Sequence, residues 1–425
     1  MNALQSKTVI IVGGGVSGLA AARFLAHRGV TPMLLEAKER MGGRIHTLLH
    51  GGLPIELGAE FIHGRSQSLL QAIADARLTA DKVRDHQQQW SGGKFQTTEL
   101  WGEIAEVMGR IDGNAPDESF ADFMGHSNFP DSVRKLAMGF VQGFDAADPK
   151  RISVQALLKA ENSANQMEGS WQGRVREGYG ALIDYLAAED VRQGGTIVKN
   201  CLVDRIDWKK GSVQVRAVTN GEAATHMAAA AIVTVSLGVL KAGQIRFEPD
   251  LPKKREAIDQ LEFGNVIKCV MVFRRRWWQP SVDGFILAPD EQFPTWWDDP
   301  RGPVLTAWVG GPRADVLRQE SSEQLKAICI DILARIFSEQ PELIRQQLAE
   351  FHYHDWAEDP HILGAYSYIP VNGLDLPKLL AAPVEGTLFF AGEATVTDAQ
   401  MGTVFGALES GERAAKEVLE AIATV

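Results

Sequence analysis

The chain has 425 residues, 45% of them hydrophobic and 23% charged, which is typical of a folded globular protein of about two domains and excludes a disordered chain. Aspartate and glutamate outnumber lysine and arginine by 54 to 43, and the formal net charge of −11 argues against a nucleic-acid partner. The three cysteines, Cys201, Cys269 and Cys329, are far apart and include no Cys-x-x-Cys pair, so neither a disulfide framework nor a zinc site is expected.

No targeting or membrane segment is expected either. The first strand pattern begins at Thr8, which leaves no room for a signal peptide. The longest uncharged apolar run, Met227 to Leu240, has 14 residues, fewer than the roughly 18 that suggest a membrane span. Together with cysteines that fit a reducing compartment, these features predict a cytoplasmic protein without a membrane span.

The N-terminal segment has the pattern of a strand, a tight turn and a helix. Apolar residues 8–12 indicate a buried strand, which leads directly into Gly13, Gly15 and Gly18 at G-x-G-x-x-G spacing. The first glycine permits the turn, the second lets backbone N–H groups approach a pyrophosphate, and the third allows the helix to pack closely on the strand. A helix over residues 19–28 would then direct its N-terminus at the phosphates.

The residues that follow strengthen the prediction of a dinucleotide site. Gly29 is expected to end the helix, residues 32–35 to form a second strand, and Glu36 at its end to bond ribose hydroxyls. This fingerprint leaves NAD and FAD both open. The continuation ERMGGR, residues 39–44, resembles the second signature of FAD-containing oxidoreductases, in which the arginine lies near the pyrophosphate or the flavin. That resemblance implies FAD.

Beyond this segment the patterns alternate between strands and helices. Residues 81–188 are mostly helical but irregular, and Asn220-Gly221 is a strong hairpin signal. Strands are expected at residues 53–57, 196–198, 201–208, 212–218, 266–273 and 387–391. The strands on either side of the Asn220-Gly221 turn are expected to belong to a meander, and residues 230–236 to form its buried return strand. Further helices are expected at residues 68–77, 322–337 and 403–421.

We therefore expect an α/β protein with a discontinuous, Rossmann-type FAD-binding domain and an inserted α+β substrate domain of mixed sheet plus helices. The cofactor domain is predicted to comprise residues 1–78, 190–248 and 380–425. The substrate domain is predicted to comprise residues 79–189 and 249–379. In this arrangement both ends of the chain meet at one cofactor.

A set of blocks spread almost from end to end of the chain carries a further resemblance. They are VGGGVSGLAAA with LLEAKERMGGR, GAEFIHG (58–64), AIVTVSLGVLK (231–241), NVIKCVMVF (265–273), WAEDPHILGAYSYIP (356–370) and FAGEATVTDAQMGTVFGALESGERAA (390–415). Together they resemble the flavin-containing amine oxidase family, which includes monoamine and polyamine oxidases. The resemblance implies oxidation of a primary or secondary amine to an imine, with O2 reduced to H2O2. It also implies non-covalent FAD, because Ala365 stands where covalently flavinylated monoamine oxidases carry a cysteine.

The resemblance further implies where FAD is held. Glu393 would meet the ribityl and pyrophosphate region, the backbone at Thr403 and Val404 the edge of the isoalloxazine ring, and the backbone of Val203 the adenine. The full set of predicted cofactor contacts is Gly13, Gly15, Val16, Ser17, Gly18, Glu36, Ala37, Gly43, Arg44, Gly58, Ala59, Glu60, Val203, Gly392, Glu393, Gly402, Thr403 and Val404. No metal-ligand spacing is present in the sequence.

Three residues are predicted to carry the chemistry. Lys268 lies in an otherwise apolar strand, so its ammonium must be solvated, paired or lowered in pKa. The resemblance implies a water-bridged bond from Lys268 to flavin N5 and a role in reoxidation by oxygen. It places Tyr366 beside the flavin, where an aromatic slot desolvates and orients the amine, and His63 near the substrate nitrogen. The structural alternatives are a lysine on the wet face of a strand, a tyrosine packed against Tyr368 and a histidine bonded in the core.

Several functional alternatives remain open at this point. Thr403 replaces the second aromatic of the monoamine oxidase cage, which is closer to polyamine oxidases. An L-amino-acid oxidase would need an arginine where Glu60 and Phe61 stand, and a flavin-dependent desaturase would not need Lys268. A catalytically silent FAD-binding interaction protein could keep the first and last blocks. Four tryptophans could wall a substrate tunnel or belong to the core: Trp277, Trp278, Trp296 and Trp297.

Overall fold

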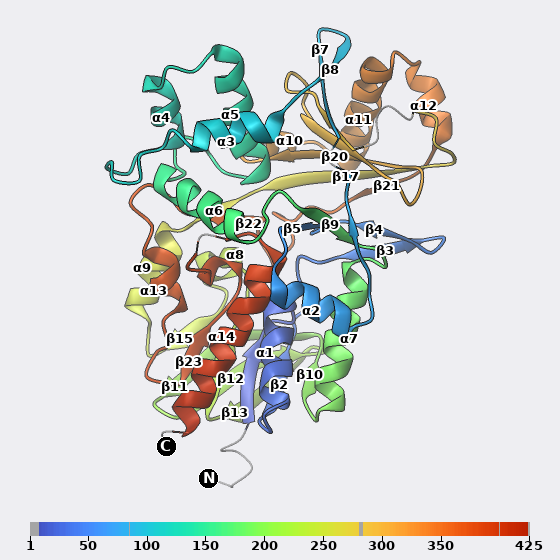
Figure 1. Ribbon diagram of the computed structural model, residues 1–425. Helices are drawn as coiled ribbons and strands as arrows, with labels where there is room; N and C mark the ends of the chain where they lie inside the picture. Colours follow the sequence, from blue (N-terminus) through green and yellow to red (C-terminus); the bar gives the residue numbers. More distant parts are fainter. Residues whose placement is uncertain (1–7, 85, 280–283, 399, 424–425) are drawn as a thin grey trace.

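The computed structural model describes residues 8–84, 86–279, 284–398 and 400–423, and it shows a mixed α/β protein (Figure 1). A five-stranded parallel sheet occupies the lower half of Figure 1, in the order β10-β2-β1-β14-β23. Its strands are Thr196–Val198 (β10), Thr31–Leu35 (β2), Thr8–Val12 (β1), Ala230–Val233 (β14) and Leu388–Phe390 (β23). Segments from the start, the middle and the end of the chain therefore form one sheet.

The centre of this sheet is β1, whose residues 9–12 are almost completely buried. Val and Ile suit a strand that is covered on both faces. Helices α1 (Val16–Ala26) and α14 (Val404–Ala423) run side by side along the sheet (Figure 1). The two helices approach so closely that a Cβ on Gly411 would lie 2.1 Å from the carbonyl oxygen of Ser17. The absence of a side chain at Gly411 thus lets the last helix pack against the first, and α7 (Tyr179–Arg192) also packs on α1.

A second, mixed sheet covers the other face of the parallel sheet. Its order is β13-β12-β11-β15, with the strands Glu222–Ala228, Ser212–Thr219, Cys201–Lys209 and Arg246–Glu248. Asn220 and Gly221 join β12 to β13 and have φ values of 49° and 86°, so the predicted hairpin turn is confirmed. Ile10 and Val12 of β1 share one apolar core with Val203 and Val215 of this sheet.

The upper half of the molecule is built on a seven-stranded sheet in the order β21-β17-β20-β19-β18-β7-β8. The strands are Leu348–Tyr353, Val266–Phe273, Val304–Gly310, Thr295–Asp299, Phe285–Leu287, Gln87–Ser91 and Lys94–Thr97. Strand β17 is buried along its whole length. Its odd-numbered residues, such as Cys269, pack beneath α11 (Ser322–Phe337), while Lys268 and Val270 face the opposite way. Because side chains alternate along a strand, Lys268 points toward the lower half of the molecule.

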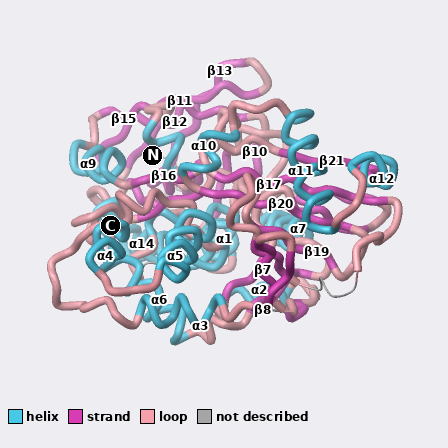
Figure 2. The backbone as a smooth tube through the Cα atoms, turned by 90° about the horizontal axis from the view of Figure 1, so that it is seen from above, coloured by secondary structure: helices cyan, strands magenta, loops and turns pink. Residues whose placement is uncertain are grey.

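Helices from residues 100–166 form a group on one side of this sheet, and α11 and α12 lie on the far side of the strands (Figure 2). The group comprises α3 (Leu100–Met108), α4 (Phe120–His126), α5 (Asp131–Phe144) and α6 (Val154–Gln166).

Short ladders connect the two halves: β3 (Thr47–His50) with β4 (Leu53–Glu56), β5 (Phe61–His63) with β9 (Gln172–Val175) and β6 (Ala80–Lys82), and β16 (Glu262–Gly264) with β22 (Tyr366–Tyr368). The remaining helices are α2 (Gln67–Asp75), α8 (Leu237–Lys241), α9 (Pro252–Gln260), α10 (Pro312–Leu317), α12 (Pro341–Gln347) and α13 (Leu376–Ala381).

One prediction about the middle of the chain was wrong, and another was incomplete. Residues 81–188 contain the predicted helices, but the turn cluster at Gly92-Gly93 also closes the hairpin β7–β8, which extends the upper sheet. The strand expected at 230–236 ends at Val233 and belongs to the parallel sheet instead of the meander, where it pairs with β1 and β23. Ser236 instead caps α8, since its hydroxyl accepts from the backbone N–H of Val239.

Within the described part of the chain, no helix combines the length and the apolar character needed to cross a membrane. Residues 1–7, on which the predicted absence of a signal peptide partly depends, lie outside the described residues.

Candidate active site

A cavity of about 870 Å³ runs between the two halves of the molecule. Every residue predicted for the site lines this cavity except Gly18. It is bounded at one end by the glycine loop after β1 and at the other by α3, α5 and α6. The cavity therefore brings together residues from the start, the middle and the end of the chain.

The glycine loop presents open backbone to the cavity. Gly13 has a φ of +112°, which favours glycine, and a Cβ on Gly18 would lie 2.0 Å from the carbonyl oxygen of Gly13. These two glycines thus allow the turn and its contact with α1. Gly15 is different, because its φ of −73° suits any residue and a Cβ there would meet no atom within 4 Å. The space in front of Gly15, at the N-terminus of α1, fits the pyrophosphate of a dinucleotide.

The ERMGGR segment lies directly against this loop. The backbone N–H of Gly42 donates to the carbonyl oxygen of Gly14 at 2.8 Å, and a Cβ on Gly43 would lie 3.4 Å from the Cα of Gly15. Gly43 has a φ of +57°. Two glycine-rich segments that are separated in sequence thereby form one wall of the cavity.

Glu36 lies at the end of β2 and is 8% exposed. Its Oε2 accepts from the backbone N–H of Gly14 at 2.6 Å, and its Oε1 accepts from the backbone N–H of Lys38 at 2.8 Å. Each carboxylate oxygen can accept a further hydrogen bond, so Glu36 can still bind ribose hydroxyls. Ala37 and Val203 form the cavity wall beside it.

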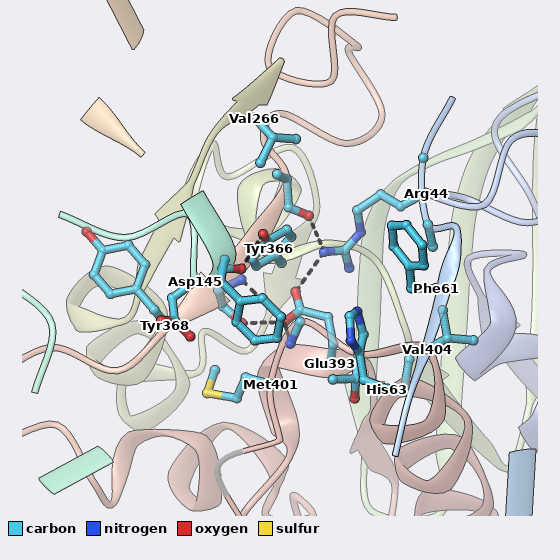
Figure 3. Close-up of a pocket in the computed structure, with 18 of the residues that line it drawn as sticks. Arg44, Phe61, His63, Asp145, Val266, Tyr366, Tyr368, Glu393, Met401 and Val404 are labelled. Carbon is cyan, nitrogen blue, oxygen red and sulfur yellow. Dashed lines mark hydrogen bonds and ion pairs between the residues drawn. The ribbon is translucent and has the colours of Figure 1, made fainter. Parts of the chain in front are cut away.

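Arg44 and Glu393 form an ion pair that joins the two ends of the chain (Figure 3). Arg44 Nη1 donates to Glu393 Oε1 at 2.8 Å and to the carbonyl oxygen of Ala365 at 2.6 Å. Glu393 Oε2 accepts from Ser367 Oγ at 2.5 Å and from the backbone N–H of Gly402 at 3.0 Å. Both oxygens of Glu393, which was predicted as a cofactor contact, are thus engaged by the protein.

Thr403 has a structural task that the sequence did not indicate. Its Oγ1 accepts from the backbone N–H of Gly406 at 3.0 Å and donates to the carbonyl oxygen of Gln400 at 2.8 Å, so it caps the start of α14. Gly402, Thr403 and Val404 line the cavity at this helix N-terminus, and Gly392 lies at the preceding turn.

Lys268 is 2% exposed and is paired, one of the three states expected for a lysine in an apolar strand. Its Nζ lies 2.7 Å from Oε2 of Glu60 and donates to the carbonyl oxygen of Gly58 at 3.1 Å. Arg174 Nε lies 2.8 Å from Glu60 Oε1, and Trp297 Nε1 donates to the same oxygen at 3.1 Å. Burial alone would raise the pKa of Glu60, but the charges of Lys268 and Arg174 outweigh it and hold the pKa at about 2. Glu60 is therefore a carboxylate that holds the lysine at the cavity wall.

Tyr366 and His63 lie on the wall of the same cavity (Figure 3), and both contact Phe144 of α5. The hydroxyl of Tyr366 donates to the carbonyl oxygen of Phe144 at 2.7 Å. Burial raises the pKa of Tyr366 far above its usual range, and the carboxyls of Asp145 and Glu393 add to this. The ring of His63 meets Phe144 edge to face at 5.4 Å, and burial lowers the pKa of His63 to about 4. His63 is therefore a neutral imidazole at physiological pH.

The four candidate tryptophans divide between the core and the cavity. Trp297 lines the cavity, with Phe61 at 5.3 Å between ring centroids. The other three pack with Phe273 and Phe293 in the core beneath α11: Trp277, Trp278 and Trp296.

Sequence reasoning missed part of the site. Trp101, Phe140 and Phe144 of α3 and α5 add to the aromatic wall, and Asp145 follows them at the end of α5. Arg174, the second cation at Glu60, comes from β9. All five lie in the region that was predicted only as irregular helix, where no periodicity or motif marks them.

Comparison with known proteins gives a consistent result. The family model described as flavin containing amine oxidoreductase matches residues 16–419. Polyamine oxidase 2 of Arabidopsis thaliana is 30% identical over 97% of this chain and 88% of its own length. The flavin-containing amine oxidase A of Sus scrofa is 24% identical over 100% of this chain and 87% of its own length.

Solved structures have the same fold. A wild-type putrescine oxidase bound to putrescine superposes with a TM-score of 0.82 at 21% identity, covering 97% of this chain and 99% of its own. The family match spans most of the chain, and it agrees with the glycine loop, Glu36 and the open space at Gly15. The chain belongs to the flavin-containing amine oxidoreductase family.

Proposed function

We propose that this FAD-dependent amine oxidase acts on an amine whose carbon chain lies in the aromatic part of the cavity and whose reacting end lies beside Lys268. The observation that carries the proposal is the continuity of one cavity, from the open backbone at Gly15 to the aromatic side chains of α3 and α5. Lys268 and Tyr366 line the cavity between these ends.

The residues that would hold FAD follow from the chemistry of the cavity wall. The backbone of the glycine loop and the N-terminus of α1 suit the pyrophosphate, and Glu36 suits the ribose hydroxyls. Ala365 offers no thiol for attachment, which supports non-covalent binding. When bound, FAD supplies acceptance of a hydride equivalent from the carbon next to nitrogen and delivery of the electrons to O2.

The protein contributes a pocket that orients the amine and excludes water. Aromatic side chains such as Trp297, Phe61 and Phe144 desolvate the carbon chain and limit its poses. His63 adds no charge, because its imidazole is neutral. Lys268, held by Glu60 on the cavity wall, would supply a positive charge that stabilises negative charge developing on oxygen during reoxidation.

Oxidation of an L-amino acid is less well supported. Such an enzyme needs a cation for the substrate carboxylate. Among the described arginines that line the cavity, Arg44 pairs with Glu393, and Arg313 donates to the backbone carbonyls of Pro289 and Glu291. Neither of these guanidinium groups is without partners.

The test is anaerobic mixing of the purified, FAD-loaded protein with monoamines, diamines, polyamines and aromatic amines. Loss of the flavin absorbance, followed by H2O2 formation when oxygen is admitted, is expected for at least one class. FAD without protein serves as the blank. Bound FAD that no amine reduces would favour a silent flavoprotein, and reduction by L-amino acids alone would favour an amino-acid oxidase.

We also propose that the protein works in a reducing compartment, the cytoplasm. All three cysteines are buried and free, which supports this assignment. Fractionation of the source cells, with the protein found only outside the cytoplasmic fraction, would contradict it.

A further inference from the structure

Asp145 lies on the wall of the cavity, and no described residue forms a hydrogen bond or an ion pair with its carboxyl group. It follows the last residue of α5 and lies beside Tyr366 (Figure 3). Its Oδ2 is sealed from solvent and has no hydrogen-bond partner among the described residues, whereas its Oδ1 is not among the sealed atoms and is the oxygen that a ligand in the cavity can reach. No ion pair of Asp145 exists in the described part of the chain either, so none of the described residues supplies a counter-charge when Asp145 is ionised.

Other carboxylates on the described cavity wall are engaged. Glu36 accepts from two backbone N–H groups, Glu60 meets Lys268 and Arg174, and Glu393 meets Arg44. Glu161 of α6 accepts from Asn165 Nδ2 at 3.4 Å. The cation Lys135 on the same wall is already paired with Asp290. Asp145 therefore differs from these carboxylates, because no described residue is its partner.

Aromatic side chains lie next to Asp145, and the carboxylate of Glu393, which acts on the same Tyr366 hydroxyl, is already paired with Arg44. Phe144 stacks on Phe140 at 5.0 Å, His63 meets Phe144 edge to face, and the Tyr366 hydroxyl is occupied by the Phe144 carbonyl. Burial raises the pKa of Asp145 to about 7. A carboxylate in such a place is costly unless a cation joins it, and aromatic faces add to the attraction for a cation.

We propose that Asp145 binds a second ammonium group of the substrate, one that is not oxidised, so that the pocket favours amines with two nitrogens over monoamines. The inference rests on the proposed amine oxidation. The reacting nitrogen must be neutral to release electrons from the neighbouring C–H bond, whereas a carboxylate within hydrogen-bond distance favours the charged ammonium. A carboxylate here consequently suits the nitrogen that stays charged.

The test compares substrates that differ by one ammonium group. Putrescine is paired with butylamine and cadaverine with pentylamine, and kcat/KM is measured for the FAD-loaded protein and for Asp145→Asn. The variant should lose about 10- to 100-fold in kcat/KM for the diamines, the usual effect of losing a charged hydrogen bond, and change little for the monoamines. Asp145→Glu keeps the charge and should retain much of the preference.

Asp131→Asn is the matched control, because it makes the same charge change on an exposed side chain at the other end of α5. It should leave both substrate classes unchanged. Equal losses for diamines and monoamines in Asp145→Asn, or no loss for either, would overturn the inference. Thermal unfolding with bound FAD confirms that the variant is folded.

Anaerobic calorimetric titration with putrescine separates this inference from the proposed function. Putrescine should bind Asp145→Asn at least about tenfold more weakly than the parent protein, while butylamine binding stays the same. Unchanged putrescine binding would overturn the role of Asp145 whether or not the protein turns over amines. Absence of any amine oxidation, with Asp145-dependent putrescine binding intact, would overturn only the proposed function.

Discussion

Lys268 Nζ lies 2.7 Å from Glu60 Oε2, and the two side chains are only 2% and 7% exposed. The pair joins β17 of the upper sheet to the loop between β4 and β5, and Arg174 adds a second cation from β9. Three elements that are distant in sequence thereby fix one ammonium on the cavity wall. Stability and function both depend on this arrangement, and they can be tested separately.

Glu60→Gln should lower the stability of the protein. Glutamine keeps the shape of the side chain, but it leaves the ammonium of Lys268 and the guanidinium of Arg174 buried without a counter-charge. Removing one partner of a buried ion pair costs about 3–5 kcal/mol. Thermal unfolding should show a clear drop in the midpoint. Asp81→Asn, which removes the exposed pair with Arg176, should change it little, and equal midpoints for the two variants would contradict the expectation.

Lys268→Met should slow reoxidation of the reduced enzyme by oxygen at least about tenfold while FAD stays bound. The substitution removes the positive charge that would stabilise negative charge developing on oxygen. Stopped-flow absorbance after anaerobic reduction with dithionite measures the rate. Lys254→Met is the control, since Lys254 is also buried, at 4% exposed, but donates to the carbonyl oxygens that end α13 and does not line the cavity. Unchanged oxygen kinetics in Lys268→Met would remove the proposed role.

Much of the fold could be predicted where neighbouring residues decide the structure. Strands β1 and β17 and helix α11 have the predicted bounds, because their apolar patterns are long and regular. Helix α1 was placed three residues too late at its start. Its N-cap is Gly15, which has no side chain to signal the boundary.

The parts of the site that were missed depend on contacts between distant segments. Glu60 was predicted as a cofactor contact, but its neighbours on the chain do not reveal that Lys268 and Arg174 will meet it. Asp145 lies in a stretch whose only signal was irregular helix. Tertiary packing decides whether a carboxylate lies next to a cation, and no periodicity in a single sequence predicts such a contact.

His63→Gln should make the protein less sensitive to mild acid. Burial lowers the pKa of His63 from 6.5 to about 4, so between these values the unfolded chain binds a proton that the folded chain does not. The stability due to neutral His63 is therefore present above about pH 6.5 and is lost as the pH falls toward 4. Thermal midpoints of the parent protein should fall more than those of His63→Gln between pH 7 and pH 5. The exposed His126→Gln is the control, and parallel curves for parent and His63→Gln would refute the expectation.

Gly15→Ala should weaken FAD binding without disturbing the apoprotein. Its φ of −73° is accessible to alanine, and the added methyl group would meet no protein atom within 4 Å. The methyl group would instead occupy the space assigned to the pyrophosphate, so a loss of about tenfold or more in FAD affinity is expected. Fluorescence titration of the apoprotein with FAD measures this, and apoprotein melting should match the parent. Gly125→Ala in α4, equally unobstructed and outside the cavity wall, should leave the FAD affinity unchanged. An unchanged Kd for FAD in Gly15→Ala would mean that the cofactor does not approach this loop, and the placement of every other cofactor contact would then have to be revised.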